Sequence, residues 1–212
     1  MGEHAAGPVV SSWRRIDAWL AVHAPAALAA LRPPVAAEEL EAAQRVVGVP
    51  FPAELRESLS CHDGAGAWTG LLPEQSPLGA AGIAEHWRMR LEIASDNDGL
   101  VVRPWDDEPW WHPLWVPWAE SADGGVQVID LRPGHASGRL GRAGHSGGGD
   151  FSDAWPGLAE YLHEVSRALW HGGGVRGTYP YLTADGDLWW DFGGGCPSVD
   201  GEPLTPAPVG LG

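Results

Sequence analysis

The feature that most constrains the fold of this chain is a change in hydrophobic spacing near Gly70. Before that point, apolar residues recur at three- and four-residue intervals, as Trp13, Ile16 and Leu20 do, which is typical of amphipathic helices. After it, the run Gly124–Leu131 alternates and is rich in β-branched residues, which predicts a strand. Helices that precede strands, instead of alternating with them, indicate an α+β fold and not a doubly wound sheet.

The same patterns predict the individual elements and the domain organisation. Helices are expected to begin at Ser11 or Ser12, Pro25, Ala36 and Pro52 and to cover 83–93 and 151–170, with strands over 124–131 and 137–145 and a hairpin over 178–192 around Asp185-Gly186. We therefore predict a domain over 1–170 with N-terminal helices, a small mixed or antiparallel sheet and a C-terminal amphipathic helix. A β-hairpin extension over 171–192 packs on it, and the Gly- and Pro-rich residues 193–212 form a flexible tail.

Composition limits the partners of the chain. It has 28 acidic residues against 13 basic ones, all of them Arg, for a net charge of −15. That charge disfavours nucleic acid and anionic membranes and favours a basic partner. Cys61 and Cys196 match no zinc or redox spacing, and the sequence shows no signal peptide and no apolar run that could span a bilayer. We expect a cytoplasmic protein of undetermined oligomeric state.

Two glycine-rich motifs match parts of a serine hydrolase. Residues 144–148 have the G-x-S-x-G form around Ser146, and residues 171–174 have the HGGG form of an oxyanion hole. A nucleophile elbow needs a buried strand before the serine and a helix directly after it, and HGGG belongs upstream of it. The sequence has polar, glycine-rich flanks and the opposite order, so a hydrolase is the least favoured hypothesis.

Other polar stretches have structural interpretations. Ser60–Asp63 places a thiol beside an imidazole and a carboxylate, but neighbours at a helix end do not face each other for proton transfer. His62 is expected instead to complement the helix dipole. Asp96–Gly99 lacks the acid spacing of a calcium loop and is expected to form turns. The nine histidines are scattered, so the sequence predicts no metal site and no cofactor.

Trp105 to Trp118 reads WDDEPWWHPLWVPW, and its three prolines exclude a helix. We expect Trp115 and Trp118 to lie on a core strand. Trp105, Trp110 and Trp111 border a loop, where they either pack inward or form an exposed patch. Base stacking would require a positive groove, which the net charge does not supply, whereas sugar stacking beside carboxylates stays open.

The order of these features resembles the SUKH superfamily, which includes the yeast Smi/Knr cell-wall regulators and many bacterial immunity proteins. The resemblance covers about residues 28–170, with no single specific motif. It is carried by Gly48-Val49-Pro50-Phe51-Pro52, Asp63-Gly64, Leu71-Leu72-Pro73, Trp87, Trp115-Val116-Pro117, Ile129–Gly134, Gly138-Arg139-Leu140-Gly141, His145 and a closing helix over 152–170. Arg142 departs from the polar residue, often Gln, that follows the second glycine in the family.

The resemblance implies an α+β fold with a mixed sheet flanked by helices, and a non-enzymatic binding module. In bacteria it implies immunity, in which the protein binds and blocks a cognate toxin, often a nuclease or deaminase. The family's toxin-facing residues vary, so none is carried over. On physical grounds the candidate partner-binding residues are Asp106, Asp107, Glu108, Trp110 and Trp111, with charges that speed association and aromatics that anchor it. The alternatives are a cell-wall or glucan-synthesis regulator that binds carbohydrate through exposed tryptophans, and a hydrolase built on Ser146.

Overall fold

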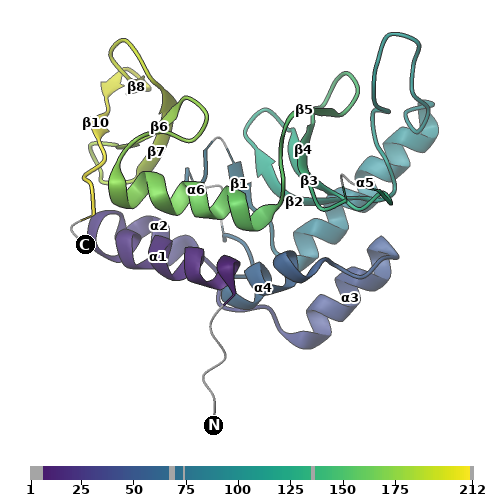
Figure 1. The fold of residues 1–212 in the computed structure, drawn as a ribbon, viewed down its shortest axis with the longest axis horizontal. Helices are drawn as coiled ribbons and strands as arrows, with labels where there is room; N and C mark the ends of the chain where they lie inside the picture. The colour runs from purple at the N-terminus through teal and green to yellow at the C-terminus, as the bar shows by residue number, and fades with distance from the viewer. Residues whose placement is uncertain (1–6, 67–69, 74, 135–136, 211–212) are drawn as a thin grey trace.

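The computed structural model describes residues 7–66, 70–73, 75–134 and 137–210 (Figure 1). The helices are α1 (Pro8–His23), α2 (Pro25–Ala30), α3 (Ala37–Val47), α4 (Ala53–Cys61), α5 (Ala80–Asp96) and α6 (Leu158–His171). The strands are β1 (Gln75–Pro77), β2 (Trp115–Ser121), β3 (Val126–Asp130), β4 (Leu140–Ala143), β5 (Asp150–Trp155), β6 (Thr178–Leu182), β7 (Leu188–Phe192), β8 (Ser198–Val199), β9 (Glu202–Pro203) and β10 (Thr205–Pro206). The predicted α+β class is confirmed.

The main sheet has five strands in the order β1-β2-β3-β4-β5, and every pairing is antiparallel. Pro117 lies in the part of β2 that pairs with β3 alone, because β1 pairs only with Ala119, Glu120 and Ser121. Proline cannot donate a ladder hydrogen bond, so a position without a second neighbouring strand suits it. The β2–β3 register shifts between Pro117 and Ala119, and this irregularity accommodates the proline.

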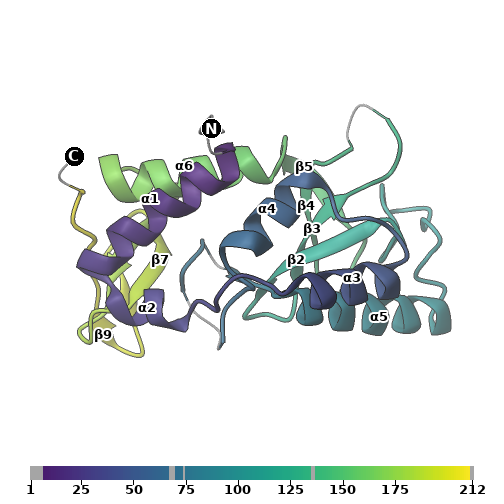
Figure 2. The same ribbon diagram turned by 90° about the horizontal axis from the view of Figure 1, so that it is seen from below.

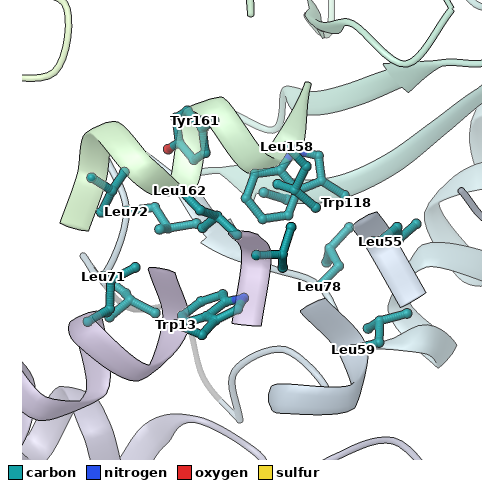
Figure 3. Packing of buried hydrophobic residues seen from close by; sticks show 14 of the residues in the cluster. Trp13, Leu55, Leu59, Leu71, Leu72, Leu78, Trp118, Leu158, Tyr161 and Leu162 are labelled. Carbon is teal, nitrogen blue, oxygen red and sulfur yellow. The ribbon is translucent and has the colours of Figure 1, made fainter. Parts of the chain in front are cut away.

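Four of the helices form two side-by-side pairs. Helix α1 runs beside α6 and helix α3 runs beside α5, as both views show (Figures 1 and 2). The larger core lies among α1, α4, α6 and the sheet, where Trp13, Leu59, Trp118 and Leu162 pack (Figure 3). A smaller core joins α5 to the sheet through Ala94, Trp111, Trp115, Val126, Val128 and Ala143. The predicted burial of Trp115 and Trp118 is confirmed.

The predicted boundaries were wrong for three helices, the first of which is α5, predicted over 83–93 and found over Ala80–Asp96. Residues 151–155 belong to strand β5, and α6 begins only at Leu158, after Pro156 and Gly157. Pro156 has no N–H and disfavours a helical conformation at Trp155, so the strand and the helix stay separate elements. Helix α1 begins at Pro8 instead of Ser11 or Ser12, because proline is well suited to the first turn of a helix.

The C-terminal part forms a second, smaller sheet in the order β10-β6-β7. The predicted hairpin is confirmed, since Tyr181 pairs with Trp189 in its register. Residues 193–212 were expected to form a flexible tail. Over the part that the structure describes, residues 193–210, the chain folds back: Thr205 pairs with Leu182, and the Trp19 indole donates to the Pro208 carbonyl at 3.1 Å. Composition alone could not predict these contacts. The segment is held in place by backbone pairing and by a buried indole that needs a hydrogen-bond acceptor, and neither depends on the composition of the segment itself.

Candidate partner-binding site

The segment between α5 and β2 contains all the residues proposed from sequence for partner binding, and it extends away from the body of the molecule (Figure 1). Helix α5 ends where the Gly99 N–H donates to the Ala94 carbonyl at 2.8 Å, and Asp98 adopts the left-handed conformation. Aspartate tolerates that conformation better than most residues, so the turn predicted over Asp96–Gly99 forms here. The chain then divides into two parts, which we call the loop tip (residues 100–107) and the anchored segment (residues 108–114).

The loop tip presents apolar side chains to solvent. Trp105 is 77% exposed and Val101 is 65% exposed. The tip and the neighbouring outer face of α5 carry six of the eleven exposed large hydrophobic residues in the described chain: Met89, Ile93, Leu100, Val101, Val102 and Trp105. Met89 and Ile93 are four residues apart on the helix and therefore share one face. Exposed apolar residues gathered in one place, unlike single scattered ones, mark surfaces used for binding.

Acidic side chains lie next to this apolar surface. Asp107 is exposed and Asp106 is half-buried beside Gly148. Within the described residues neither carboxylate forms an ion pair with an arginine or a histidine. Within the described structure their charges are therefore not compensated by a cation, and partner binding through them stays a prediction.

Glu108 is engaged inside the molecule. Its carboxylate forms a two-pronged ion pair with the Arg132 guanidinium, at 2.6 and 2.9 Å, and lies 3.3 Å from Arg139. Both arginines also bind Asp130, at 2.8 and 3.1 Å. The four charges compensate one another, so Glu108 fixes the loop to β3 and the start of β4 instead of offering a free charge.

The same contacts set the protonation states of this cluster. Burial opposes ionisation of Asp130, but the hydrogen bonds from Arg132 and Arg139 outweigh it and lower the pKa of that carboxyl. Hydrogen bonds to Glu108 and then to Asp130 raise the pKa of Arg132 further above its already high value. The Arg139 guanidinium also stacks 4.1 Å from the Phe151 ring. The cluster joins the anchored segment to the β3–β4 connection and acts as a structural clamp.

The two adjacent tryptophans are not surface anchors. Trp111 is fully buried in the smaller core, and its backbone N–H donates to the Gly99 carbonyl at 3.1 Å. Trp110 is half-buried, and its indole donates to the His145 carbonyl at 3.1 Å. Of the two alternatives left open for these rings, the structure shows inward packing for Trp111 and partial burial for Trp110. The proposed role of Trp111 in partner binding is therefore corrected, because core packing takes up its whole side chain.

Arg90 explains why both rings turn inward. This arginine is buried on the inner face of α5, with its guanidinium 5.5 Å from the ring centres of both Trp110 and Trp111. It also donates to the carbonyls of Gly124 and Gly144, at 2.7 and 3.1 Å. Burial lowers its pKa, and the charge of Asp123 opposes that shift. One cation thus joins α5, the anchored segment and two turns of the sheet.

No role was predicted for Arg90 from the sequence. The available signal was its spacing from Ile83, Trp87 and Ala94, which all lie on the buried or half-buried side. An arginine at a core position needs compensating acceptors or aromatic faces, and tryptophans at 110 and 111 could have indicated them.

The hydrolase motifs are not assembled in the way that an elbow requires. Ser146 lies in an exposed loop between β4 and β5, so a strand follows it where a helix is needed. Among the described residues, no hydrogen bond joins Ser146 to a histidine. The HGGG motif follows the end of α6, where Gly172 and Gly173 adopt positive φ. Both motifs supply turns.

The Ser60–Asp63 stretch is also structural. His62 binds the Asp17 carboxylate at 3.0 Å and packs edge-on against Trp13, which joins the end of α4 to α1. Asp63 accepts a hydrogen bond from the first N–H of α5 at 2.7 Å. Burial raises the pKa of the Cys61 thiol, which disfavours a reactive thiolate.

The described residues contain neither a candidate metal-binding group nor a candidate transmembrane helix. No group of three or more His, Cys, Asp or Glu side chains there could hold a metal ion. None of the helices in the described ranges combines the length and the apolarity needed to cross a bilayer.

Comparison with known proteins places the fold in a family. The model of the SMI1/KNR4 family (SUKH-1) matches residues 34–164, from just before α3 into α6. No curated protein matches the chain in sequence. The match includes the loop tip, the anchored segment and the whole main sheet, while α1, α2 and the C-terminal sheet lie outside it. Since the model spans more than half of the 212 residues, this chain belongs to the SMI1/KNR4 family (SUKH-1).

Proposed function

We propose that this protein is a non-enzymatic immunity module that binds a basic bacterial toxin, of the nuclease or deaminase type, and thereby blocks it. Members of its family generally act by binding partner proteins. The net charge of −15 supports a basic partner, because long-range attraction speeds encounter between oppositely charged proteins. Two free cysteines, Cys61 and Cys196, are compatible with the reducing cytoplasm, where we place the protein.

The observation that carries this proposal is the composition of the loop tip. Trp105 is 77% exposed, and it precedes Asp106 and Asp107 directly in the chain. Tryptophan is the side chain that most often contributes strongly to binding energy at protein interfaces, and carboxylates beside it can pair with Arg or Lys of the partner. In this arrangement Trp105 anchors the complex, whereas Asp106 and Asp107 steer association.

The sequence-based set of contact residues is revised accordingly. Asp106 and Asp107 stay in the proposed site, and Trp105 replaces the Trp110–Trp111 pair as the aromatic anchor. Met89 and Ile93 extend the apolar surface along α5. Glu108 supports the site from inside, through its pair with Arg132.

The test is protection of cells against a toxin encoded beside the gene for this chain. The toxin domain is co-expressed with the wild-type chain, Trp105→Ala, or the double variant Asp106→Asn/Asp107→Asn, and survival and binding kinetics are measured. We expect the wild type to protect, Trp105→Ala to weaken binding by about 30-fold, and the double variant to slow association by about tenfold.

The matched control is Asp185→Asn/Asp187→Asn, which removes the same charge from exposed positions in the β6–β7 turn. Equal slowing by the two double variants would show that net charge, and not the loop tip, governs association. Absence of protection by the wild type against the adjacent toxin would contradict the proposed function.

Carbohydrate binding is the second candidate, and it rests on the same exposed indole beside two carboxylates. A sugar ring can stack on Trp105 and donate hydroxyl hydrogen bonds to Asp106 or Asp107. Quenching of tryptophan fluorescence by glucan oligomers that disappears in Trp105→Ala would favour this candidate. Unchanged fluorescence at millimolar glucan would argue against it.

A further inference from the structure

A groove separates the main sheet from the C-terminal hairpin, which stand at opposite ends of α6 (Figure 1). It consists of two cavities of about 280 and 410 Å³. Arg142 of β4 and Phe192 of β7 line both of them, so the cavities are successive sections of one groove with these two side chains between them. Phe192 is 60% exposed there although it is aromatic.

The two walls of the groove come from different parts of the chain. One wall, within the residues matched by the family, includes Gln75, Gln127, Arg142 and Trp155. The other wall includes Arg176, Thr178, Trp189 and Phe192, all beyond residue 164, where the family match ends. The groove therefore exists because this chain carries its C-terminal sheet.

A buried hydrogen-bond acceptor lines the groove. Gln75 of β1 is 4% exposed, and its Oε1 atom has no hydrogen-bond partner among the described residues. A buried amide oxygen without a donor is unfavourable, so a ligand that displaces the side chains covering it and brings an N–H group to it relieves that cost. Gln127 lies on the same wall, but its Oε1 already accepts from the Trp118 indole at 2.8 Å.

The charges of the groove favour a cation. Arg142 pairs with Asp123 at 3.0 Å, and Arg176 pairs with Asp153 at 3.1 Å while it stacks 3.8 Å from the Trp155 ring. Both arginines therefore have a compensating carboxylate. Asp150 and Asp191 also line the groove, so four carboxylates line it against two arginines. Asp150 accepts hydrogen bonds from Ser152 and lies within reach of the Arg142 charge, whereas Asp191 accepts from the Phe192 N–H.

We propose that this groove receives an extended, basic segment of the partner polypeptide, which inserts a side-chain N–H group toward Gln75 Oε1. An Arg or Lys side chain satisfies the acceptor and balances the excess acidic charge of the groove, to which Asp191 contributes, and an adjacent apolar residue covers the exposed Phe192 ring. An extended polypeptide places its side chains at regular intervals, so neighbouring side chains of one segment can occupy the two adjacent cavities. This inference rests on the proposed function and adds a second contact surface, distinct from the loop tip.

The probe is a fluorescein-labelled peptide of four Arg-Val repeats with blocked ends, measured by fluorescence anisotropy against the full chain at 0.15 M salt. We expect saturable binding that an equivalent Glu-Val peptide does not show. Gln75→Leu, which removes the acceptor without leaving a void, should weaken binding about tenfold, and Phe192→Ser should weaken it several-fold. Val22→Ser, at an exposed apolar position that does not line the groove, should leave it unchanged.

The comparison between variants decides the inference. Thermal melting first establishes that each variant folds, and Phe192→Ser provides the answer if Gln75→Leu does not fold. Binding that is lost in Trp105→Ala but kept in both groove variants would overturn the inference, as would absence of binding or equal binding of the acidic peptide.

Protection assays with the same groove variants separate this inference from the proposed function. Wild-type protection that both groove variants retain in full would overturn the groove contact and leave immunity intact. Peptide binding that depends on Gln75 and Phe192, in a chain that gives no protection, would support the groove and contradict immunity.

Discussion

The loop tip and the anchored segment are adjacent in sequence and similar in composition, yet they have opposite environments. Trp105 in the tip is 77% exposed, while Trp111 in the anchored segment is fully buried. This difference in burial arises from the contacts that other parts of the fold make with Trp111 and do not make with Trp105. Arg90 from α5 lies 5.5 Å from the Trp111 ring, and the smaller core surrounds it, whereas Trp105 belongs to neither core cluster of the described chain.

The acidic residues divide in the same way. Glu108 forms ion pairs with Arg132 and Arg139, which lie between β3 and β4, so its charge contributes to folding. Asp107, one residue earlier, meets none in the described structure and stays exposed. Local composition thus supplies a mixture of aromatic and acidic groups, and packing then uses some of them for stability and leaves the others exposed.

The largest expected effect comes from truncating the buried tryptophan. Trp111→Ala should lower the free energy of unfolding by about 3–5 kcal/mol, because it opens a cavity in the smaller core. Trp111→Phe should cost much less, since it keeps most of the ring and removes an indole N–H that has no partner among the described residues. Urea denaturation followed by circular dichroism measures both, and equal losses would contradict the cavity explanation.

The next effect concerns the cation beneath the anchored segment. Arg90→Met keeps most of the side-chain volume but leaves the Gly124 and Gly144 carbonyls without their donor, so we expect a loss of about 2–4 kcal/mol. The control Arg88→Met, at an exposed position on the same helix, should change stability by less than about 0.5 kcal/mol. Hydrogen exchange should then accelerate in the anchored segment more than in α1, and uniform acceleration would argue against a local role.

A smaller effect follows from the Glu108–Arg132–Asp130–Arg139 cluster. Asp130→Asn should cost about 1–3 kcal/mol at pH 7, because it weakens charged hydrogen bonds. The pKa of Asp130 is lowered from its ordinary value of 3.8, so the stability that it contributes is fully present above about pH 4 and is lost as the pH falls through the lowered value.

The difference in melting temperature between wild type and Asp130→Asn should therefore be constant from pH 6 to pH 5 and should shrink below pH 4. A difference that stays unchanged down to pH 2 would show that the ionised carboxylate does not stabilise the fold. Asp107→Asn serves as the control, because this carboxylate is exposed and has no cation partner in the described structure.

The smallest effect on stability is expected in the loop tip. Trp105→Ala should change the free energy of unfolding by less than about 0.5 kcal/mol, because the side chain makes little contact with the core. Together with a large loss of partner binding, this would complete the contrast with Trp111. A stability loss above about 2 kcal/mol would mean that the indole packs inward in solution and that the tip is not a binding surface.

Much of the fold could be predicted from hydrophobic spacing. The α+β class, the helical N-terminal half, strand β3 and the β6–β7 hairpin all follow from patterns that depend on neighbours in the chain. Strand β5 was missed because its residues run directly into α6 in sequence, and only pairing with β4 identifies it as a strand. The folded C-terminal segment was missed because its contacts, to Trp19 and Pro180, lie far away in sequence.

The sequence by itself determined which groups this protein can use: a strongly acidic chain, tryptophans beside carboxylates, and elements whose order matches a known family. Only the tertiary structure decided which of those groups are buried or paired within the fold. Buried polar groups must find partners, and those partners come from distant elements, as Arg90 does for Trp111 and Arg132 does for Glu108. Among the described residues, those that remain without such a partner are chiefly Trp105, Asp106 and Asp107. They form the surface that we propose for binding.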